Sequence, residues 1–446
     1  MCGIVGVRSE RGVRLSRVVS VLQGLQHRGQ EASGFVGITT DGREVGFKDV
    51  GLVSEVFRRY GADPLLKVAV AHTRYSTQGE SYRPENVQPF VGFIGERLLA
   101  LVHNGNLTNY PQLKAELQRD GVILRSTSDS EVILLLYARE SGAPEERIRR
   151  LTSKVEGAWT VLMIDGDRLL AFRDPYGFRP LWMGREGDEV WFASEDSALR
   201  SAEIDVVEEV GIGEGYVVDG RVRKFGVGVK VPLPCSFELV YFARPDSNLF
   251  GRSVYEWRLR AGEVLAEVDS LEADVVVPVP DSGTIYAIGY ARRSGIPFQM
   301  GLIRSHYVGR SFIQPSQDVR RRTVRAKLFP VPFVLKGRRV VLIDDSLVRG
   351  TTMREIVRMV RDAGAKEVHV RIGSPPVISP CYFGIDTPTR EELAASRMDT
   401  ARIGEFIEAD SILYLPLSRF REALPNFCVS CFTGEYAVKV PSDVRV

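Results

Sequence analysis

The 446-residue sequence lacks any apolar run near the roughly 20 residues that a membrane-spanning helix requires. It also lacks net charge of one sign, because 59 Lys and Arg stand against 57 Asp and Glu. A net charge of +2 gives no overall field for a nucleic acid or an anionic membrane. The start of the chain lacks the uninterrupted apolar segment of a signal peptide. We therefore expect a cytoplasmic globular protein with no membrane and no nucleic-acid partner.

Cysteine is also scarce. The five cysteines are Cys2, Cys235, Cys381, Cys428 and Cys431. An odd number in a chain without an export signal argues against a disulfide framework. If Cys2 has a separate role, the other four match the number of ligands in a tetrahedral sulfur site. The C-x-x-C at 428–431 fits a zinc, redox or iron–sulfur role, and unrelated buried thiols remain an alternative.

The first half of the chain, to about residue 230, has short alternating apolar runs such as VAVAHTRYST and RLLALVHNGNL, bounded by Gly, Asn and Asp. This alternation is typical of antiparallel strands. Helical stretches intervene, such as DSEVILLLYARE, which Ser128 or Asp129 can cap. The pattern predicts a sheet-rich α+β domain, and the total length allows two or three domains.

The pattern changes after KVPLPCSFELVYFARPDS, which ends at residue 247. The apolar runs ADVVVPVP, RRVVLIDD and KEVHVRIG alternate with helical segments, one ending at Gly295 and one over 352–363 that Gly364 stops. In the second helix Met353, Ile356, Val357 and Val360 share one face. Alternating strands and helices predict a parallel sheet with ligand sites at the carboxyl ends of its strands.

Cys2 follows the initiator methionine directly, in MCGIVGV. Removal of Met1 would place the thiol beside its own α-amino group, whose ordinary pKa of about 7.7 to 8.0 allows it to act as a base. The residue would then supply both a nucleophile and its base. The alternative is a chance cysteine at a frayed terminus.

An acyl-transfer nucleophile also needs oxyanion donors and groups that hold the substrate. Asn104 and Gly105 could donate an amide N–H each, although Asn-Gly is equally a hairpin-turn signal. Arg74 could clamp a carboxylate, and Asp129 could accept from an ammonium group. Ordinary surface ion pairs are the alternative for these last two.

The segment VVLIDDSLVRGTT at 340–352 places Asp344 and Asp345 at a strand end, before a loop and a helix. The loop N–H groups, the hydroxyls of Ser346, Thr351 and Thr352, and the helix dipole suit a phosphate. The two carboxylates suit ribose hydroxyls, directly or through a metal ion. Simple strand-ending and helix-capping roles are the alternative.

Two further segments accompany this motif. PVPDSG at 278–283 offers Asp281, Ser282 and Gly283 at a second strand end, where a pyrophosphate–magnesium group could bind. Residues 304–327 carry seven Arg and Lys, which indicates either a lid over a polyphosphate or a nucleic-acid arm. The neighbouring phosphate motif and the absence of a series of aromatic residues favour the lid.

Together these residues resemble the glutamine phosphoribosylpyrophosphate amidotransferases over nearly the whole chain. The motifs that carry the resemblance are MCGIVGV, HRGQEASG, HTRYST, HNGNL, DPYGFRPL, FELVYFARPDS, PVPDSG, HYVGRSFIQP, IDDSLVRGTT, SPPVISPCYFGIDTP and CVSCFTGEY.

The resemblance implies an α+β N-terminal-nucleophile hydrolase domain, an αββα sandwich over 2–230 with glutaminase activity. An α/β type I phosphoribosyltransferase domain with a parallel sheet and the cluster ligands would follow over 231–446. It further implies an amidophosphoribosyltransferase that makes 5-phosphoribosylamine, glutamate and pyrophosphate in the first committed step of purine synthesis. Ammonia would pass internally from one site to the other.

The residue roles follow from the same resemblance. Cys2 would attack glutamine, Asn104 and Gly105 would stabilise the oxyanion, and Arg74 and Asp129 would hold the substrate. The expected phosphoribosyl pyrophosphate site is Asp344, Asp345, Ser346, Arg349, Gly350, Thr351 and Thr352. One Mg²⁺ per subunit would bind Ser282, Asp344 and Asp345, and the arm at about 304–327 would close over the substrate.

The resemblance also implies a [4Fe–4S] cluster, one per subunit, on Cys235, Cys381, Cys428 and Cys431, since all four cysteines lie in matching segments. It implies a homotetramer inhibited by AMP and GMP. Because only Met1 precedes Cys2, maturation should need methionine removal alone, whereas several cluster-type relatives carry a longer propeptide.

Two rival functions leave some of these residues without a role. Another amidotransferase, such as a hexosamine-phosphate synthase or asparagine synthetase, has no use for IDDSLVRGTT. A regulator that senses phosphoribosyl pyrophosphate has no use for Cys2 together with Arg74, Asn104 and Asp129.

Overall fold

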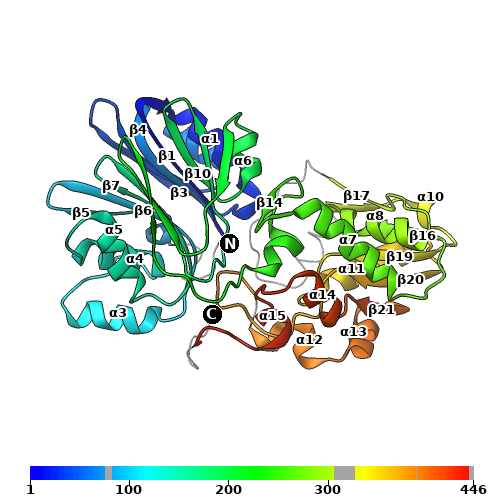
Figure 1. Cartoon of the computed structure of the whole chain (residues 1–446). Coiled ribbons are helices and arrows are strands. Elements are labelled where there is room, and N and C mark those ends of the chain that lie inside the picture. The colour runs from blue at the N-terminus through cyan, green and yellow to red at the C-terminus, as the bar shows by residue number, and fades with distance from the viewer. Residues whose placement is uncertain (76–82, 306–326, 388, 441–446) are drawn as a thin grey trace.

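The computed structural model describes residues 1–75, 83–305, 327–387 and 389–440. The N-terminal half forms a sandwich of two sheets, and the C-terminal half lies beside it around a smaller sheet (Figure 1). The N-terminus lies between the two halves in this view. Among the described residues, no helix combines the length and apolar character needed to cross a bilayer.

Both sheets of the first half are antiparallel, as the alternating runs predict. One has the order β11-β9-β10-β1-β4-β2-β3 and the other β13-β12-β8-β7-β6-β5. The strands of the first are β1 (Gly3–Arg14), β2 (Ala32–Thr39), β3 (Glu44–Val50), β4 (Leu65–Arg74), β9 (Trp182–Glu186), β10 (Glu189–Ala193) and β11 (Asp205–Glu209). Those of the second are β5 (Phe90–Ile94), β6 (Arg97–Leu107), β7 (Gly157–Asp165), β8 (Arg168–Arg173), β12 (Glu214–Val218) and β13 (Val222–Gly226).

Helices cover the two outer faces of this sandwich. They are α1 (Leu15–Gly24), α2 (Val53–Tyr60) and α6 (Asp196–Arg200) on the first sheet, α3 (Tyr110–Arg119), α4 (Asp129–Arg139) and α5 (Pro144–Thr152) on the second, with short turns η1 (Gln26–Arg28) and η2 (Pro84–Asn86). Separate apolar layers lie under each helix group and between the sheets. The predicted αββα arrangement is confirmed. Ser128, rather than Asp129, caps α4 by accepting from Ser130 N–H.

The second half contains the predicted parallel sheet, of order β16-β19-β20-β21. Its strands are β16 (Val275–Pro278), β19 (Arg339–Asp344), β20 (Glu367–Ile372) and β21 (Ser411–Tyr414). Helices α7 (Val254–Glu267) and α8 (Thr284–Ser294) pack on one face, and α11 (Thr351–Asp362) and α13 (Thr400–Ile407) on the other. Gly295 and Gly364, with φ of 76° and 96°, follow α8 and α11 as expected.

Short elements complete the second half. They are the pairs β14 (Asn248–Leu249) with β15 (Arg252–Ser253) and β17 (Leu302–Arg304) with β18 (Leu328–Pro330), the helices α10 (Pro332–Leu335), α12 (Ala394–Arg397), α14 (Leu417–Ala423) and α15 (Ser430–Thr433), and the turns η3 (Glu238–Phe242) and η4 (Arg390–Glu392).

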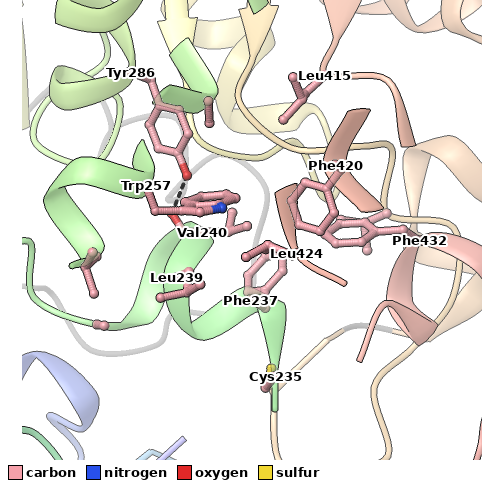
Figure 2. Packing of buried hydrophobic residues seen from close by; sticks show 14 of the residues in the cluster. Cys235, Phe237, Leu239, Val240, Trp257, Tyr286, Leu415, Phe420, Leu424 and Phe432 are labelled. Carbon is pink, nitrogen blue, oxygen red and sulfur yellow. Dashed lines mark hydrogen bonds between the residues drawn. The ribbon is translucent and has the colours of Figure 1, made fainter. Parts of the chain in front are cut away.

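One apolar core joins the two halves. Around η3, Phe237, Leu239 and Val240 pack near Trp257 and Phe432 of the second half (Figure 2). The same core contains Ala158 and Phe178 of the sandwich. The last sandwich strand ends at Gly226, and the division at 230/231 stays a prediction. Because the core is shared, the relative position of the two halves is part of the folded structure.

Candidate functional site

Cys2 lies buried just before β1, with 8% of its surface exposed, so the frayed-terminus alternative is wrong. Its backbone N–H donates to Asn104 Oδ1 at 3.2 Å, and its carbonyl accepts from Arg28 Nε at 3.1 Å. The thiol Sγ lies 3.6 Å from the carbonyl oxygen of Tyr75. Burial lowers the pKa of the terminal amine of Met1 to about 6. An amine in this environment is therefore largely unprotonated at neutral pH.

Asn104 and Gly105 lie within strand β6, where they pair with Thr160 and Trp159 of β7. The hairpin-turn alternative is therefore wrong. Among the described residues nothing accepts a hydrogen bond from the buried Asn104 Nδ2. Gly105 has φ of 148°, and a Cβ there would lie 2.1 Å from the carbonyl oxygen of Ala158. The sheet thus requires glycine at this position and leaves a buried amide donor beside Cys2.

Arg74 and Asp129 lie at the ends of regular elements near Cys2, and only 4% and 3% of their surfaces are exposed. The surface ion-pair alternative is therefore wrong for both. Within the described chain Arg74 Nη1 has no hydrogen-bond partner, and burial lowers the pKa of this guanidinium. Asp129 Oδ2 accepts from Leu107 N–H at 2.8 Å, which fixes the carboxylate against β6. A buried cation and a buried anion suit the two charged groups of an amino acid.

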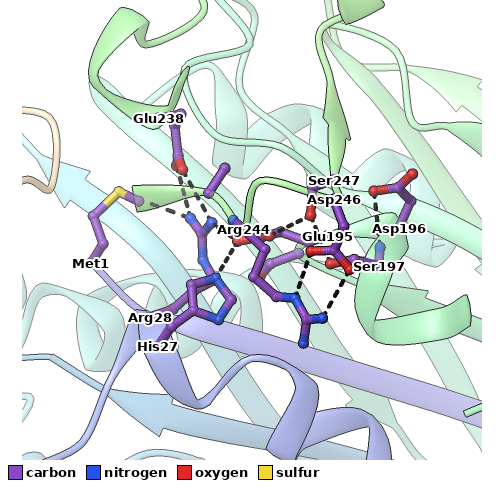
Figure 3. A network of polar contacts seen from close by, with 12 residues as sticks. Met1, His27, Arg28, Glu195, Asp196, Ser197, Glu238, Arg244, Asp246 and Ser247 are labelled. Carbon is purple, nitrogen blue, oxygen red and sulfur yellow. Dashed lines mark hydrogen bonds and ion pairs between the residues drawn. The ribbon is translucent and has the colours of Figure 1, made fainter. Parts of the chain in front are cut away.

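Arg28 connects Cys2 to the second half through a buried ionic network (Figure 3). Besides holding the Cys2 carbonyl, its guanidinium donates to Glu195 and to Glu238 of η3, whose oxygens lie 2.5 and 2.8 Å away. All three side chains are fully buried. Glu238 also lies 3.4 Å from Arg179, whose Nε donates to the carbonyl of Phe383 at 3.0 Å. The backbone around Cys2 is therefore fixed partly by residues of the second half.

No local sequence pattern indicates these connections. Arg28 is 210 residues from Glu238, and its motif HRGQ carries no chemistry that spacing alone reveals. Tyr75 contacts the Cys2 thiol through its backbone carbonyl, which any residue type could supply. The signal lies in the burial of a charged residue, which becomes visible only in three dimensions.

A cavity of about 910 Å³ lies at the carboxyl ends of β16 and β19. The expected phosphoribosyl residues all line it, namely Asp344, Asp345, Ser346, Arg349, Gly350, Thr351 and Thr352, together with Asp281 and Ser282. Gly350, with φ of 79°, is the N-cap of α11, so neither aspartate caps this helix. The loop N–H groups and the positive end of α11 therefore face the same cavity as the carboxylates.

The two adjacent carboxylates differ in their contacts. Asp344 Oδ1 accepts from Ser282 Oγ at 3.4 Å and from Asp345 N–H at 2.9 Å. Asp345 Oδ1 accepts from Ser346 Oγ at 2.6 Å. Burial raises the pKa of both, and the charge of Asp345 raises that of Asp344 further. A cation at this position would relieve the cost of two buried negative charges.

Arg304 and Lys327, at the two ends of the basic arm, line this cavity, and Arg304 pairs with Asp281 at 2.5 Å. Residues 306–326, and with them the proposed lid, lie outside the described residues.

The cavity also reaches the first half of the chain. His27 and Tyr75 line its wall, and Tyr75 is the residue whose carbonyl meets the Cys2 thiol. Tyr75 therefore contacts the Cys2 thiol through its carbonyl and also lines the cavity.

The other four cysteines, Cys235, Cys381, Cys428 and Cys431, line one small, largely apolar cavity. Cys235 and Cys428 are held side by side by a parallel β-bridge. Cys381 Sγ accepts from Phe383 N–H at 3.3 Å. Burial raises the pKa of Cys235 to about 12 and raises those of Cys428 and Cys431. Three remote segments thus bring four thiols together where only a positive group would hold them as thiolates.

Comparisons with known proteins agree with this arrangement. A family model described as "Glutamine amidotransferase domain" matches residues 72–201, and one described as "Phosphoribosyl transferase domain" matches residues 259–372. The chain is 47% identical to amidophosphoribosyltransferase 1, chloroplastic, of Arabidopsis thaliana, over 100% of this chain and 80% of that protein. It is 44% identical to an amidophosphoribosyltransferase of Methanocaldococcus jannaschii, over 99% and 98% of the two chains.

A solved structure is similar over the whole length. The glutamine phosphoribosylpyrophosphate amidotransferase of B. subtilis, complexed with ADP and GMP, has 39% sequence identity to this chain. The two superpose with a TM-score of 0.91 over 99% of this chain and 98% of that one. The likeness therefore covers both halves and their relative placement.

Proposed function

The chain belongs to the amidophosphoribosyltransferase family, and on that premise we propose which of its residues carry out each step. The enzyme is a glutamine-dependent phosphoribosyltransferase that makes phosphoribosylamine in the first step of purine biosynthesis. The observation that carries the residue assignment is the contact of the Cys2 thiol with Tyr75, a wall residue of the phosphoribosyl cavity.

Cys2 is the nucleophile once Met1 has been removed. Its freed amine takes the thiol proton, and the thiolate attacks the side-chain amide carbon of glutamine. The negative charge that develops on the amide oxygen is stabilised by Asn104 Nδ2, for which the described chain offers no other acceptor, and by Gly105 N–H. The protonated amine gives its proton to the amide nitrogen, the C–N bond breaks and ammonia leaves. Water then attacks the thioester carbon, which releases glutamate and restores the Cys2 thiol.

Arg74 and Asp129 hold the α-carboxylate and α-ammonium groups of glutamine. Both side chains are buried, so each charge acts at low dielectric. Loss of either charge would leave the matching charged group of glutamine without a counter-charge. Leu107 N–H fixes Asp129, and β4 fixes Arg74. This geometry supports selection of an amino acid over a simple amide.

Ammonia then passes inside the protein to C1 of phosphoribosyl pyrophosphate. The route runs past Tyr75 and His27 into the cavity. Ammonia that reached water would be protonated and would lose its nucleophilic lone pair. The arm at about 304–327 would close over the substrate and exclude that water.

In the cavity, the loop from Ser346 through Arg349 and Gly350 to Thr351 and Thr352 binds the 5′-phosphate. Asp344 and Asp345 face the ribose hydroxyls. One Mg²⁺ per subunit, bound by Ser282, Asp344 and Asp345, fits the paired buried carboxylates and would supply positive charge to the departing pyrophosphate. The described chain holds no group of three His, Cys, Asp or Glu suited to one metal ion, so substrate and water would complete this ion's ligands.

The four buried cysteines would hold one [4Fe–4S] cluster per subunit. A single zinc ion would draw its four sulfurs to within about 3.8 Å of one another, given Zn–S bonds of about 2.3 Å. The cluster is proposed over zinc because all four cysteines lie in segments that match those of cluster-type members of the family. The cluster would tie Cys235, Cys381 and the C-terminal Cys428 and Cys431 together as a structural staple.

AMP and GMP are the proposed feedback inhibitors, and the similar B. subtilis structure is described as a complex with ADP and GMP. The proposed assembly is a homotetramer, and the proposed location is the cytoplasm.

The decisive experiment compares glutamine and ammonia as nitrogen donors. Cys2→Ala should abolish glutamine-dependent synthesis and spare synthesis from added ammonia. In the unaltered enzyme, phosphoribosyl pyrophosphate should stimulate glutamine hydrolysis. Full glutamine use by Cys2→Ala would contradict the nucleophile assignment. Iron and sulfide analysis after anaerobic purification tests the cluster, and stoichiometric zinc without iron would exclude it.

A further inference from the structure

One short segment of the second half touches all three sites of the molecule. Residues 381–387, which we call the strap, begin at Cys381 in the cysteine site. Gly384, in the middle, lies against the backbone of Gly105. Ile385, Asp386 and Thr387, at the far end, line the phosphoribosyl cavity. The strap therefore spans the distance between the proposed oxyanion donor and the acceptor cavity.

The contact at Gly384 is a backbone contact. A Cβ built at Gly384 would lie 3.0 Å from both Cα and the carbonyl carbon of Gly105 and 3.2 Å from its oxygen. Gly384 is buried and has φ of 99°, a conformation in which other residues are strained. Any displacement of the strap toward the sandwich therefore presses directly on Gly105, the residue whose N–H is the proposed oxyanion donor.

The strap is fixed at both sides of this contact. Phe383 stacks on Phe178 with ring centroids 4.4 Å apart, and its carbonyl accepts from Arg179 Nε. Cys381 N–H donates to Thr387 Oγ1 at 2.6 Å, which closes the strap into a loop. Because the loop is closed, a shift of its cavity end is carried to Gly384 rather than absorbed along the chain.

We propose that the strap is the element through which occupation of the phosphoribosyl cavity sets the position of the Gly105 oxyanion donor. Gly384 is a positioning residue for glutamine hydrolysis, and it acts on Gly105 and not on the thiol. This inference rests on the proposed role of Cys2 and Gly105. It assigns to the second half a direct part in the chemistry of the first.

The test is the variant Gly384→Ala, assayed with glutamine in the absence and presence of phosphoribosyl pyrophosphate. A shift of a few tenths of an ångström at Gly105 should lower the stimulated kcat on the order of 10-fold. The KM for glutamine should stay unchanged, because Arg74 and Asp129 are untouched. The stimulation ratio should fall, because the pathway from the cavity ends at Gly105.

Two further readouts separate positioning from general damage. The rate at which iodoacetamide alkylates Cys2, followed by mass analysis of the N-terminal peptide, should match that of the unaltered enzyme. Synthesis from added ammonia should also be retained. The matched control is Gly434→Ala, another glycine at positive φ near the cysteine site, where the Cβ meets only the Ser379 hydroxyl at 3.0 Å. It should leave the stimulated kcat unchanged.

The proposal is overturned if Gly384→Ala keeps its stimulated kcat and stimulation ratio within twofold of the original. It is equally overturned if Cys2 alkylation slows in parallel with kcat, or if Gly434→Ala shows the same loss. If Gly384→Ala misfolds and so loses ammonia-dependent synthesis, Phe383→Leu is assayed in its place, because it loosens the strap without backbone strain. The same limits on the stimulated kcat and the stimulation ratio then apply to Phe383→Leu. Glutamine use by Cys2→Ala would instead contradict the proposed function on which this inference rests.

Discussion

The two sites of this enzyme are built in opposite ways. The groups around Cys2 lie within or at the ends of regular elements, and Asn104, Arg74 and Asp129 are all almost fully buried. The phosphoribosyl groups extend from the end of β19 through the following loop to the start of α11. Asp345 is buried, but Arg349 and Asp281 leave 42% and 61% of their side chains exposed. Hydrolysis of an amide needs donors fixed at one oxygen, whereas a large, charged substrate needs a site that can open and close.

If the two sites differ in this way, a substitution in the phosphoribosyl site should lower synthesis from both glutamine and ammonia. Asp345→Asn removes one of two adjacent buried carboxylates, and we expect kcat/KM for phosphoribosyl pyrophosphate to fall about 10³-fold, equivalent to several kcal/mol of lost charge stabilisation. The release of pyrophosphate measures this with glutamine and with ammonia. The matched control is Asp274→Asn, an exposed carboxylate of the same half that pairs with Arg339. If Asp345→Asn lost only glutamine-dependent synthesis, this contrast between the two sites would be contradicted.

Damage to the strand site should affect glutamine alone. Asn104→Ala deletes one proposed oxyanion donor, and we expect the glutamine-dependent kcat to fall about 10²- to 10³-fold while ammonia-dependent synthesis is retained. Asn109→Ala serves as control, because Asn109 bonds Lys154 and Glu156 outside the site. Equal loss with ammonia would show that Asn104 acts through the fold.

The smallest effect concerns the helix that presents Asp129. Ser128 caps α4, and Ser128→Ala should lower the free energy of unfolding by about 1 kcal/mol. Because Asp129 is the next residue, the KM for glutamine should rise while the KM for phosphoribosyl pyrophosphate stays constant. Denaturant titration and initial rates measure the two. Ser253→Ala, the equivalent cap on α7, should cost similar stability without changing the KM for glutamine. If the KM for glutamine also rose in Ser253→Ala, the contrast between the two sites would be contradicted.

Local sequence patterns predict much of this architecture. Alternation predicts the sandwich strands, and Gly295 and Gly364 mark two helix ends because glycine adopts positive φ readily. The same local logic misreads Asn104 and Gly105 as a turn signal. There the pairing with β7, more than 50 residues away, overrides the dipeptide preference.

Contacts between the halves are beyond such prediction. Arg28 with Glu238, and Gly105 with Gly384, join positions separated by hundreds of residues, and each depends on the final packing of two domains. The motifs identify the chemistry of each site. They contain nothing about the distance between the sites.

The bond between Arg28 and Glu238 has a consequence for the order in which the enzyme becomes active. A ribosome makes the N-terminal half first, so the nascent chain contains Cys2 and Arg28 well before Glu238 or Gly384. Until those later residues are made and folded, the Cys2 carbonyl and the oxyanion strand lack part of their support. We therefore expect full glutamine hydrolysis only after the half that uses its nitrogen has been made and folded.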